Sequence, residues 1–346
     1  MASRAVVIGP WDYATDSGIT GYSWVRESAR MYGKVLAADP MWGVENCRVL
    51  GEDEVRTADG VMAALEDEAS RTAPGDTFLV VYVGHGAHWG DIPGDQVHFS
   101  VSSSYKYKPW TWLSSWYVYR VIRQCRASLK VLIADCCYSN LLTHLGDTAL
   151  GDDASALPGI LGTLNAGTCV LTAVKTNPHA EAQGCPELPE ELSRCTPFSG
   201  HLLNILQSGT TDYSKELTLG LLCEAVKKEM AHCPSRHDEP RMLLNDAREG
   251  RALFTNRMDP ALREPRPQLP VEPEMWVRTL LRDSNSGLGE LLEDPRTAGD
   301  VVALLYKESD TAGRRIAHDI DKQARERFAS AEFARYWNKV ERALRQ

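Results

Sequence analysis

Short apolar runs alternate with amphipathic segments along residues 4–254 of the chain. The runs are rich in Val, Ile, Leu and aromatic residues and end at glycine or polar residues, which is typical of strands buried in a parallel sheet. The intervening segments repeat apolar residues at helical spacing. This alternation predicts an α/β fold with a mostly parallel sheet of about six strands. The predicted strands are 5–8, 47–50, 77–83, 131–134, 167–174 and 241–246, with a small hairpin near 97–101, and the predicted helices are 23–36, 57–72, 113–125, 197–208 and 217–230.

Two of the predicted strands end in residues that can carry out chemistry. The strand 77–83 stops at Gly-His-Gly, which contains His85, and the strand 131–134 stops at Asp-Cys-Cys-Tyr-Ser, in which the second cysteine is Cys137. Because parallel strands deliver their carboxyl ends to one edge of a sheet, we expect His85 and Cys137 to lie together. A neighbouring imidazole lowers the pKa of a thiol and can protonate a leaving amine. The pair therefore indicates a nucleophilic thiol.

These two motifs resemble those of the caspase-like cysteine peptidases, and in particular the bacterial caspase and metacaspase branch. The resemblance covers residues 4–254, and the histidine precedes the cysteine by about 50 residues, as it does in caspases. In metacaspase-type members the nucleophile is the third residue of an Asp-x-Cys-x-Ser block, which implies Cys137 rather than Cys136. Period-two alternation directs the two thiols to opposite faces of the strand, so only one can meet His85.

The resemblance implies a caspase-like three-layer sandwich and amide hydrolysis through a thioester. Cys137 would attack a protein or peptide substrate, and His85 would handle the protons. The backbone N–H groups of Gly86 and Cys137 would hold the developing oxyanion. In this family the histidine is commonly oriented by a backbone carbonyl near the first strand or loop. The biological setting implied is regulated bacterial defence or cell death.

The residue two before the nucleophile suggests the specificity. In the metacaspase branch this position helps to form an acidic pocket for Arg or Lys, so Asp135 favours cleavage after basic residues. The chain departs from the pattern at Val83, where a small polar residue is usual, and offers only Asp12 and Asp16 as a second acidic residue. True caspases use arginines to hold aspartate, and the nearest such residue, Arg26, is expected on a helix surface. Aspartate specificity is the alternative, and an inactive caspase-fold scaffold is an alternative of another class.

The predicted loop after the nucleophile separates the two specificities. Residues 141–158 include Asp147, Asp152 and Asp153, whereas residues 138–174 contain no lysine or arginine. An enzyme specific for Arg or Lys would leave this loop intact. An aspartate-specific enzyme would cut itself there, because exposed polar loops are the preferred sites of proteolysis.

The composition indicates an ordinary globular protein and argues against nucleic-acid and membrane partners. The chain has 346 residues, of which 43% are hydrophobic and 25% charged, as in an ordinary globular protein. The net charge of −9 argues against a nucleic-acid partner, because phosphates require a basic surface. The nine cysteines are scattered and odd in number, and the first apolar run is too short for a signal peptide or a membrane span. We therefore expect a cytoplasmic protein without a membrane partner.

Two further classes of site are disfavoured. Neither G-x-x-x-x-G-K-[ST] nor G-x-G-x-x-G follows a predicted strand, which argues against a nucleotide-binding domain. His232, Cys233 and His237 lie close together in the sequence but lack a paired Cys-x-x-Cys motif. We therefore expect no metal and no cofactor.

The composition changes near residue 258. Prolines are dense from there to residue 273, which indicates a stiff, extended linker. From residue 274 the pattern is helical, and charges of both signs are nearly balanced. The sequence thus predicts a peptidase domain over 1–257, a linker over 258–273 and a small helical module over 274–346. The module carries no catalytic candidate, so we expect it to bind a regulatory protein.

Overall fold

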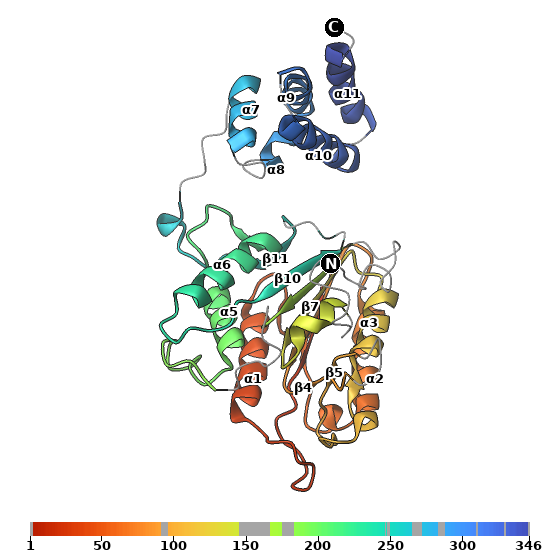
Figure 1. Ribbon diagram of the computed structural model, residues 1–346, viewed down its shortest axis with the longest axis vertical. Helices are drawn as coiled ribbons and strands as arrows, with labels where there is room; N and C mark the ends of the chain where they lie inside the picture. The colour runs from red at the N-terminus through yellow and green to blue at the C-terminus, as the bar shows by residue number, and fades with distance from the viewer. Residues whose placement is uncertain are drawn as a thin grey trace. The chain divides into compact units, whose positions relative to one another are not determined.

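The computed structural model of the chain describes residues 3–90, 96–144, 167–174, 183–245, 247, 250–264, 272–282, 288–308, 311–328 and 330–344 (Figure 1). The chain forms two compact units, Met1–Glu264 and Pro265–Gln346. The division falls inside the proline-rich segment 258–273, and the residues up to Glu264 belong to the first unit. Asp147, Asp152, Asp153 and Lys175 lie outside the described residues.

A six-stranded sheet in the order β10-β8-β7-β3-β1-β2 forms the centre of the first unit. Neighbouring strands run parallel except for β10, which pairs antiparallel with β8. The central strands β3 and β7 are buried along their whole length, which explains their near-continuous apolar sequences. The strands are β1 Arg4–Ile8, β2 Cys47–Val49, β3 Thr77–Val83, β7 Leu129–Asp135, β8 Thr168–Thr172 and β10 Arg241–Asn245. The predicted α/β fold class with a mostly parallel, six-stranded sheet is confirmed.

Helices cover both faces of this sheet (Figure 1). Alternate residues of β3 point to opposite faces: Leu79 and Val81 pack toward α1, α5 and α6, whereas Phe78 and Val80 pack toward α2 and α3. The helices are α1 Ser23–Ala38, α2 Ala58–Arg71, α3 Ser115–Gln124, α5 Pro197–Ser208 and α6 Leu219–His232. Two hydrophobic cores therefore lie on either side of the sheet, and the predicted three-layer sandwich is confirmed.

Two small sheets extend the first unit. The predicted hairpin belongs to a three-stranded antiparallel sheet of β4 Gly86–Ala87, β5 His98–Phe99 and β6 Leu113–Ser114. The second pairs β9 Glu216–Thr218 with β11 Ala252–Thr255. The predicted helix 217–230 was wrong at its start, because Leu217 pairs with Phe254 and Thr218 caps α6 by accepting a bond from Leu221 N–H. Short 3₁₀ helices span Val44–Asn46, Glu54–Arg56, Pro109–Thr111, Ser139–His144 and Pro260–Leu262.

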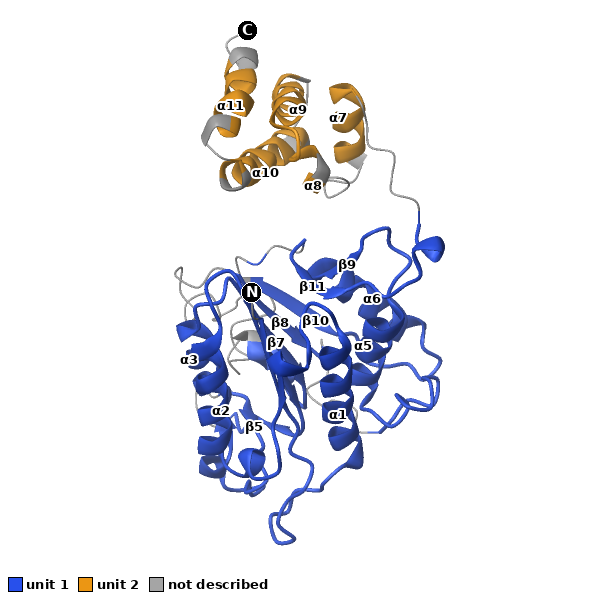
Figure 2. Cartoon of the chain, turned by 180° about the vertical axis from the view of Figure 1, so that it is seen from behind, with its two compact units in different colours: residues 1–264 blue, residues 265–346 orange. Residues whose placement is uncertain are grey.

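The second unit consists of helices (Figure 2). These helices bury a hydrophobic core of their own. Val301, Val302 and Leu305 are fully buried in this core. The hydroxyls of Tyr306 and Tyr336 both donate to the carboxylate of Asp321, which links α9, α11 and α10. The helices are α7 Pro273–Arg282, α8 Leu288–Leu291, α9 Pro295–Glu308, α10 Thr311–Arg327 and α11 Ser330–Leu344.

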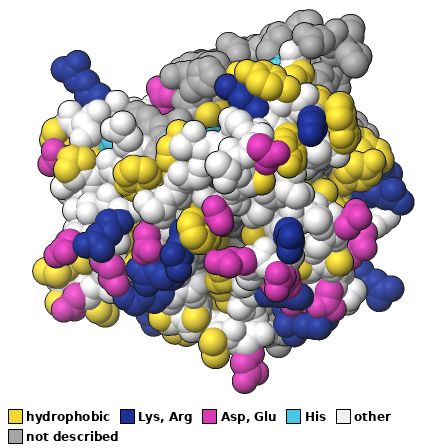
Figure 3. Space-filling model, turned by 90° about the horizontal axis from the view of Figure 1, so that it is seen from below, with side chains coloured by type: hydrophobic (Ala, Val, Ile, Leu, Met, Phe, Trp, Pro, Cys, Tyr) yellow, Lys and Arg dark blue, Asp and Glu magenta, His cyan; other side chains and the backbone are white. Residues whose placement is uncertain are grey.

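The outer surface carries charges of both signs. Acidic and basic side chains are interspersed on the face seen from below in Figure 3. Within the described residues, none of the helices is both long enough and apolar enough to span a lipid bilayer.

Candidate active site

The pairing register of the two central strands brings the two sequence motifs together. In the parallel pair of β3 and β7, Val83 lies opposite Asp135. The Gly84 N–H donates to the Asp135 carbonyl at 3.1 Å, so the pairing continues beyond the end of β3. His85 and Cys137 each follow two residues after this matched pair. They therefore leave the carboxyl edge of the sheet at the same level, on adjacent strands.

Gly86 lies tightly against the cysteine motif. A Cβ atom added at Gly86 would overlap the carbonyl oxygen of Cys137 and would crowd the Sγ of Cys136. Only glycine fits this position without a shift of the backbone. The second glycine of the Gly-His-Gly motif thus permits direct contact between the histidine and cysteine segments.

His85 is held by the main chain of the first strand-to-helix loop. The carbonyl oxygen of Thr20 lies 2.7 Å from Nε2, which must therefore be the protonated ring nitrogen. The rings of Tyr13 and Tyr22 lie 5.7 and 5.3 Å from the imidazole. Burial lowers the pKa of His85 below its ordinary value, and the bond to Thr20 opposes this shift. The imidazole is accordingly neutral near pH 7, with Nδ1 as its proton acceptor.

The two adjacent thiols have different environments. Cys136 is 1% exposed and belongs to the hydrophobic core beneath α2 and α3. Burial raises its pKa far above the ordinary value, and the nearby Cys137 and Asp135 add to this shift. Cys137 is only half-buried. Cys136 is thus an inert core thiol, while Cys137 is accessible at the edge of the sheet.

The backbone turns sharply directly after Cys137. Tyr138 has φ of 60°, a left-handed conformation that is unfavourable for a residue with a bulky side chain. Its ring lies 6.0 Å from that of His88, and its carbonyl accepts a bond from Leu141 N–H in the following 3₁₀ helix. Strained residues of this kind concentrate at active sites.

The N–H of Gly86 is directed away from strand β5. Gly86 lies opposite Phe99, and the Ser100 N–H donates to the His85 carbonyl at 3.0 Å. This pattern makes Gly86 and Phe99 a non-hydrogen-bonded pair, in which both N–H groups point outward. The Tyr82 hydroxyl also donates to the His85 carbonyl, at 2.8 Å, and fixes the peptide that precedes Gly86.

Asp135 connects the end of β7 to the start of α5. It is 3% exposed, and its Oδ2 accepts bonds from Thr196 Oγ1 at 2.5 Å, Ser199 Oγ at 2.6 Å and Ser199 N–H at 3.2 Å. Burial raises the pKa of Asp135, and these bonds oppose the rise. Thr196 occupies the N-cap position of α5, but its hydroxyl donates to Asp135 and does not accept a backbone N–H of the helix. The Asp135 carboxylate itself takes the capping role, by accepting a backbone N–H from the first turn.

Asp135 also lines a small cavity together with Ala173, Val174, His237 and Asp238. Asp12 and Asp16, the sequence candidates for a second acidic pocket residue, do not line this cavity. Both are exposed in the first loop, and the Tyr105 hydroxyl donates a hydrogen bond to Asp16. Arg26 is exposed on α1, as expected, and lies over the Trp11 ring.

Sequence reasoning did not identify Ser199 or Asp238, and it expected a backbone carbonyl near the first strand or loop to orient His85 without singling out Thr20. A main-chain carbonyl such as that of Thr20 has no signature in the sequence, because every residue carries one. Ser199 and Asp238 are ordinary helix and loop residues by local pattern. They meet Asp135 or its cavity only because α5 and the segment before β10 pack beside the end of β7.

Comparisons with known proteins give no family assignment. No protein-family model matches the sequence, and no curated protein matches it. A crystal structure of a Geobacter sulfurreducens protein aligns with a TM-score of 0.48 at 14% identity, over 77% of this chain and 98% of that one. Caspase-1 of Spodoptera frugiperda aligns with a TM-score of 0.46 at 12% identity, over 70% and 86% of the two chains. The fold described above rests on the strand order, register and cores of this chain itself.

Proposed function

We propose that the protein is a cysteine endopeptidase with Cys137 as nucleophile and His85 as proton carrier. The observation that carries this proposal is the strand register, with Val83 opposite Asp135, which aligns the two residues at one edge of the sheet. The half-buried Cys137 and the neutral, carbonyl-anchored His85 suit the two roles.

In the proposed reaction, Nδ1 of His85 accepts the proton of the Cys137 thiol as the sulfur attacks the scissile carbonyl. The resulting oxyanion is held by the N–H groups of Gly86 and Cys137, each worth about 3 kcal/mol in other proteases. The imidazolium then gives its proton to the leaving amine, and a thioester remains. Water, deprotonated by His85, hydrolyses the thioester, releases the carboxylate product and restores the thiol.

Covalent labelling tests the nucleophile directly. Intact protein is incubated with a thiol-directed peptide electrophile, and the modified residue is located by peptide mass mapping. We expect one label at Cys137 in the wild type and in Cys136→Ala, and no label in Cys137→Ala. An inactive scaffold would leave Cys137 unlabelled in the folded wild-type protein, which would refute the proposal.

We further propose that cleavage follows Arg or Lys. The support is the acidic pair Asp135 and Asp238 beside the end of β7, where they line a cavity of about 10 Å³ that must widen before it can receive a basic side chain. Asp135 also caps α5, so replacing it would disturb both charge and structure. Asp238→Asn separates the two effects, because it removes a charge from the cavity and leaves the bonds of Asp135 to α5 in place.

Self-cleavage tests the specificity without a designed substrate. Wild-type protein is incubated and analysed by mass spectrometry, with Cys137→Ala as the control. We expect an intact chain, or cuts only after basic residues such as Lys175, Arg194, Arg263 or Arg266. Cysteine-dependent cuts after Asp147, Asp152 or Asp153 would make the protein aspartate-specific. In a peptide library, Asp238→Asn should weaken the preference for Arg and Lys over Asp.

For the second unit we propose a regulatory role. It carries no residue of the proposed reaction, and its helices bury a core that is independent of the first unit. We infer that it binds a protein that controls the peptidase, in a setting of bacterial defence or cell death. Capture of a partner by residues 265–346 alone, but not by residues 1–264, is the result expected.

A further inference from the structure

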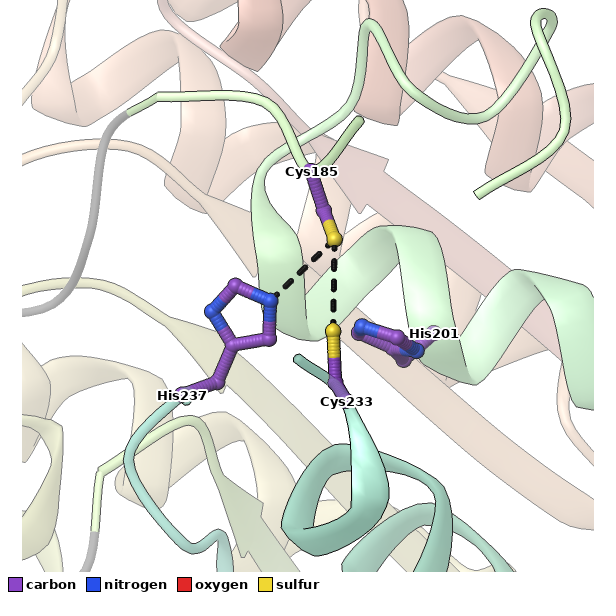
Figure 4. Close-up of side chains that lie close together, drawn as sticks. All are labelled: Cys185, His201, Cys233 and His237. Carbon is purple, nitrogen blue, oxygen red and sulfur yellow. Dashed lines mark hydrogen bonds between the residues drawn. The ribbon is translucent and has the colours of Figure 1, made fainter. Parts of the chain in front are cut away.

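Four side chains from four separate segments converge at a second site (Figure 4). Cys185 lies in the loop before α5, and His201 lies in α5 itself. Cys233 ends α6, and His237 lies between α6 and β10. Their potential ligand atoms all lie within 4.8 Å of one another. We call these four residues the Cys2His2 cluster.

The spacing of the cluster fits a tetrahedral metal ion. The two sulfurs are 3.6 Å apart, and His237 Nε2 is 3.2 Å from Cys185 Sγ. Zinc bonds are about 2.3 Å to sulfur and about 2.0 Å to nitrogen. Around a tetrahedral zinc ion, two sulfur ligands would therefore lie roughly 3.8 Å apart, and a sulfur and a nitrogen ligand roughly 3.5 Å apart. A disulfide requires sulfurs about 2.05 Å apart. The two sulfurs are too far apart for a disulfide, and their hydrogen-bond contact of 3.6 Å is close to the spacing of two ligands on one zinc ion.

His201 supplies an independent sign of a ligand. Its side chain is buried, with 3% of the residue exposed, and its Nδ1 lies 2.9 Å from Glu229 Oε1. The carboxylate accepts a hydrogen bond from Nδ1–H, so the neutral ring carries its lone pair on Nε2. Among the described residues, this buried Nε2 has no hydrogen-bond partner. A histidine that binds zinc through one ring nitrogen usually donates the N–H of the other nitrogen to a carboxylate. His201 has this carboxylate, and its Nε2 is left to bind the metal.

The Glu229 carboxylate is itself fixed in position. Asn204 Nδ2 donates to the same Oε1 at 2.9 Å. His201 and Asn204 both lie in α5, while Glu229 lies in α6, so this network also joins the two helices. The orientation of the His201 ring is thereby set before any ion binds.

We propose that the Cys2His2 cluster binds one structural zinc ion. Four protein ligands complete a tetrahedral shell and leave no position for substrate or water, which is typical of structural rather than catalytic sites. Thiolate ligands favour zinc over calcium or magnesium. Each thiol releases its proton as its sulfur binds, so zinc with two thiolates and two neutral imidazoles carries no net charge. The sequence concealed this site because only Cys233 and His237 are close along the chain.

The ion would brace the surroundings of Asp135. His237 lines the same small cavity as Asp135, and α5, which carries His201, also carries the Ser199 that binds the Asp135 carboxylate. The loop that begins near Cys185 ends at Thr196, another donor to Asp135. Zinc would thus hold together the loop, the two helices and the segment before β10 around this carboxylate.

Metal analysis of the full chain, purified under reducing conditions, tests the proposal. Elemental mass spectrometry should find about one zinc ion per chain. The Cys137→Ala chain should retain this zinc, which distinguishes the cluster from metal bound at Cys137 and His85. Cys185→Ser and His237→Gln should each lower the zinc affinity at least about ten-fold. The matched controls, Cys47→Ser and the exposed neighbour His232→Gln, should leave it unchanged.

A second measurement requires no variant. Chelated wild-type protein is titrated with Co²⁺, and thiolate-to-cobalt charge transfer with tetrahedral d–d bands is the result expected. A folded wild-type chain that lacks zinc and gives no such spectrum would overturn the proposal. So would a Cys185–Cys233 disulfide in protein purified under the same reducing conditions. Because neither measurement depends on peptide hydrolysis, failure here is separate from failure of the proposed peptidase activity.

Discussion

The molecule contains two groupings of cysteine and histidine that are built in opposite ways. At the sheet edge, His85 and the half-buried Cys137 follow paired strands, and a main-chain carbonyl holds the imidazole. The Cys2His2 cluster gathers four side chains from loops and helices, and a carboxylate holds the imidazole of His201. On the two proposals made for these sites, the same residue types would serve different chemistry. A nucleophile requires access and one neighbouring base, whereas a structural metal requires enclosure and four ligands.

Substitutions at the sheet edge have the largest expected effect. Cys137→Ala should lower peptide hydrolysis at least about 10³-fold, and His85→Ala nearly as much, because the bond-forming atom or its base is lost. Cys136→Ala should keep a substantial fraction of activity, because that thiol lies in the core. Fluorogenic peptide assays on chains whose circular dichroism matches the wild type measure this. An inactive Cys136→Ala beside an active Cys137→Ala would reverse the assignment.

The substitution Gly86→Ala tests the close contact between Gly86 and the Cys137 carbonyl. The added methyl overlaps the Cys137 carbonyl, so the two motifs must separate. A displacement of about 1 Å at reacting groups lowers rates by about 10². We expect kcat to fall by this factor, with little change in zinc content. Gly51→Ala is the matched control, since the nearest atom to its added Cβ would be 3.7 Å away. An equal fall in kcat for Gly86→Ala and Gly51→Ala would show that activity does not depend on the contact between Gly86 and Cys137.

The pH dependence of kcat/KM tests whether burial lowers the pKa of His85. Burial lowers its pKa below the ordinary value of 6.5, so the neutral base persists to lower pH. The acid limb of kcat/KM should therefore lie below pH 6.5. Tyr22→Ala exposes the ring and should move this limb upward, toward 6.5. Tyr117→Ala, which removes a side chain exposed on α3, should not move it. A wild-type limb above pH 6.5 would contradict the role assigned to His85.

Removal of the second unit should have the smallest effect. A chain that ends at Glu264 keeps the bonds from Arg263 to the Asn256 and Met258 carbonyls and from Glu264 N–H to the Thr211 carbonyl. We expect it to fold, to bind zinc and to cleave small peptides within about three-fold of the full chain, because the two units have separate cores. Thermal unfolding and peptide assays measure this. Loss of cooperative unfolding would mean that the helices belong to the main core.

Local pattern was enough to predict much of the fold and to nominate the sheet-edge residues. Strands such as β3 and β7 are buried on both faces, so their apolar runs stand out in the sequence. The parallel arrangement then predicts that the residues after both strands meet at one edge, which nominated His85 and Cys137. These inferences need only the order of residues within each segment, because helical and strand periods are properties of neighbouring positions.

Contacts between distant segments were decided by the tertiary structure alone. The Thr20 carbonyl that orients His85, the capping of α5 by Asp135 and the pairing of β9 with β11 have no local signature. The Cys2His2 cluster draws its ligands from positions 185 to 237, and two of them lie far from the other pair along the chain. Such sites form only after the cores on both faces of the sheet have positioned their helices. The sequence supplies the side chains, but packing determines which of them meet.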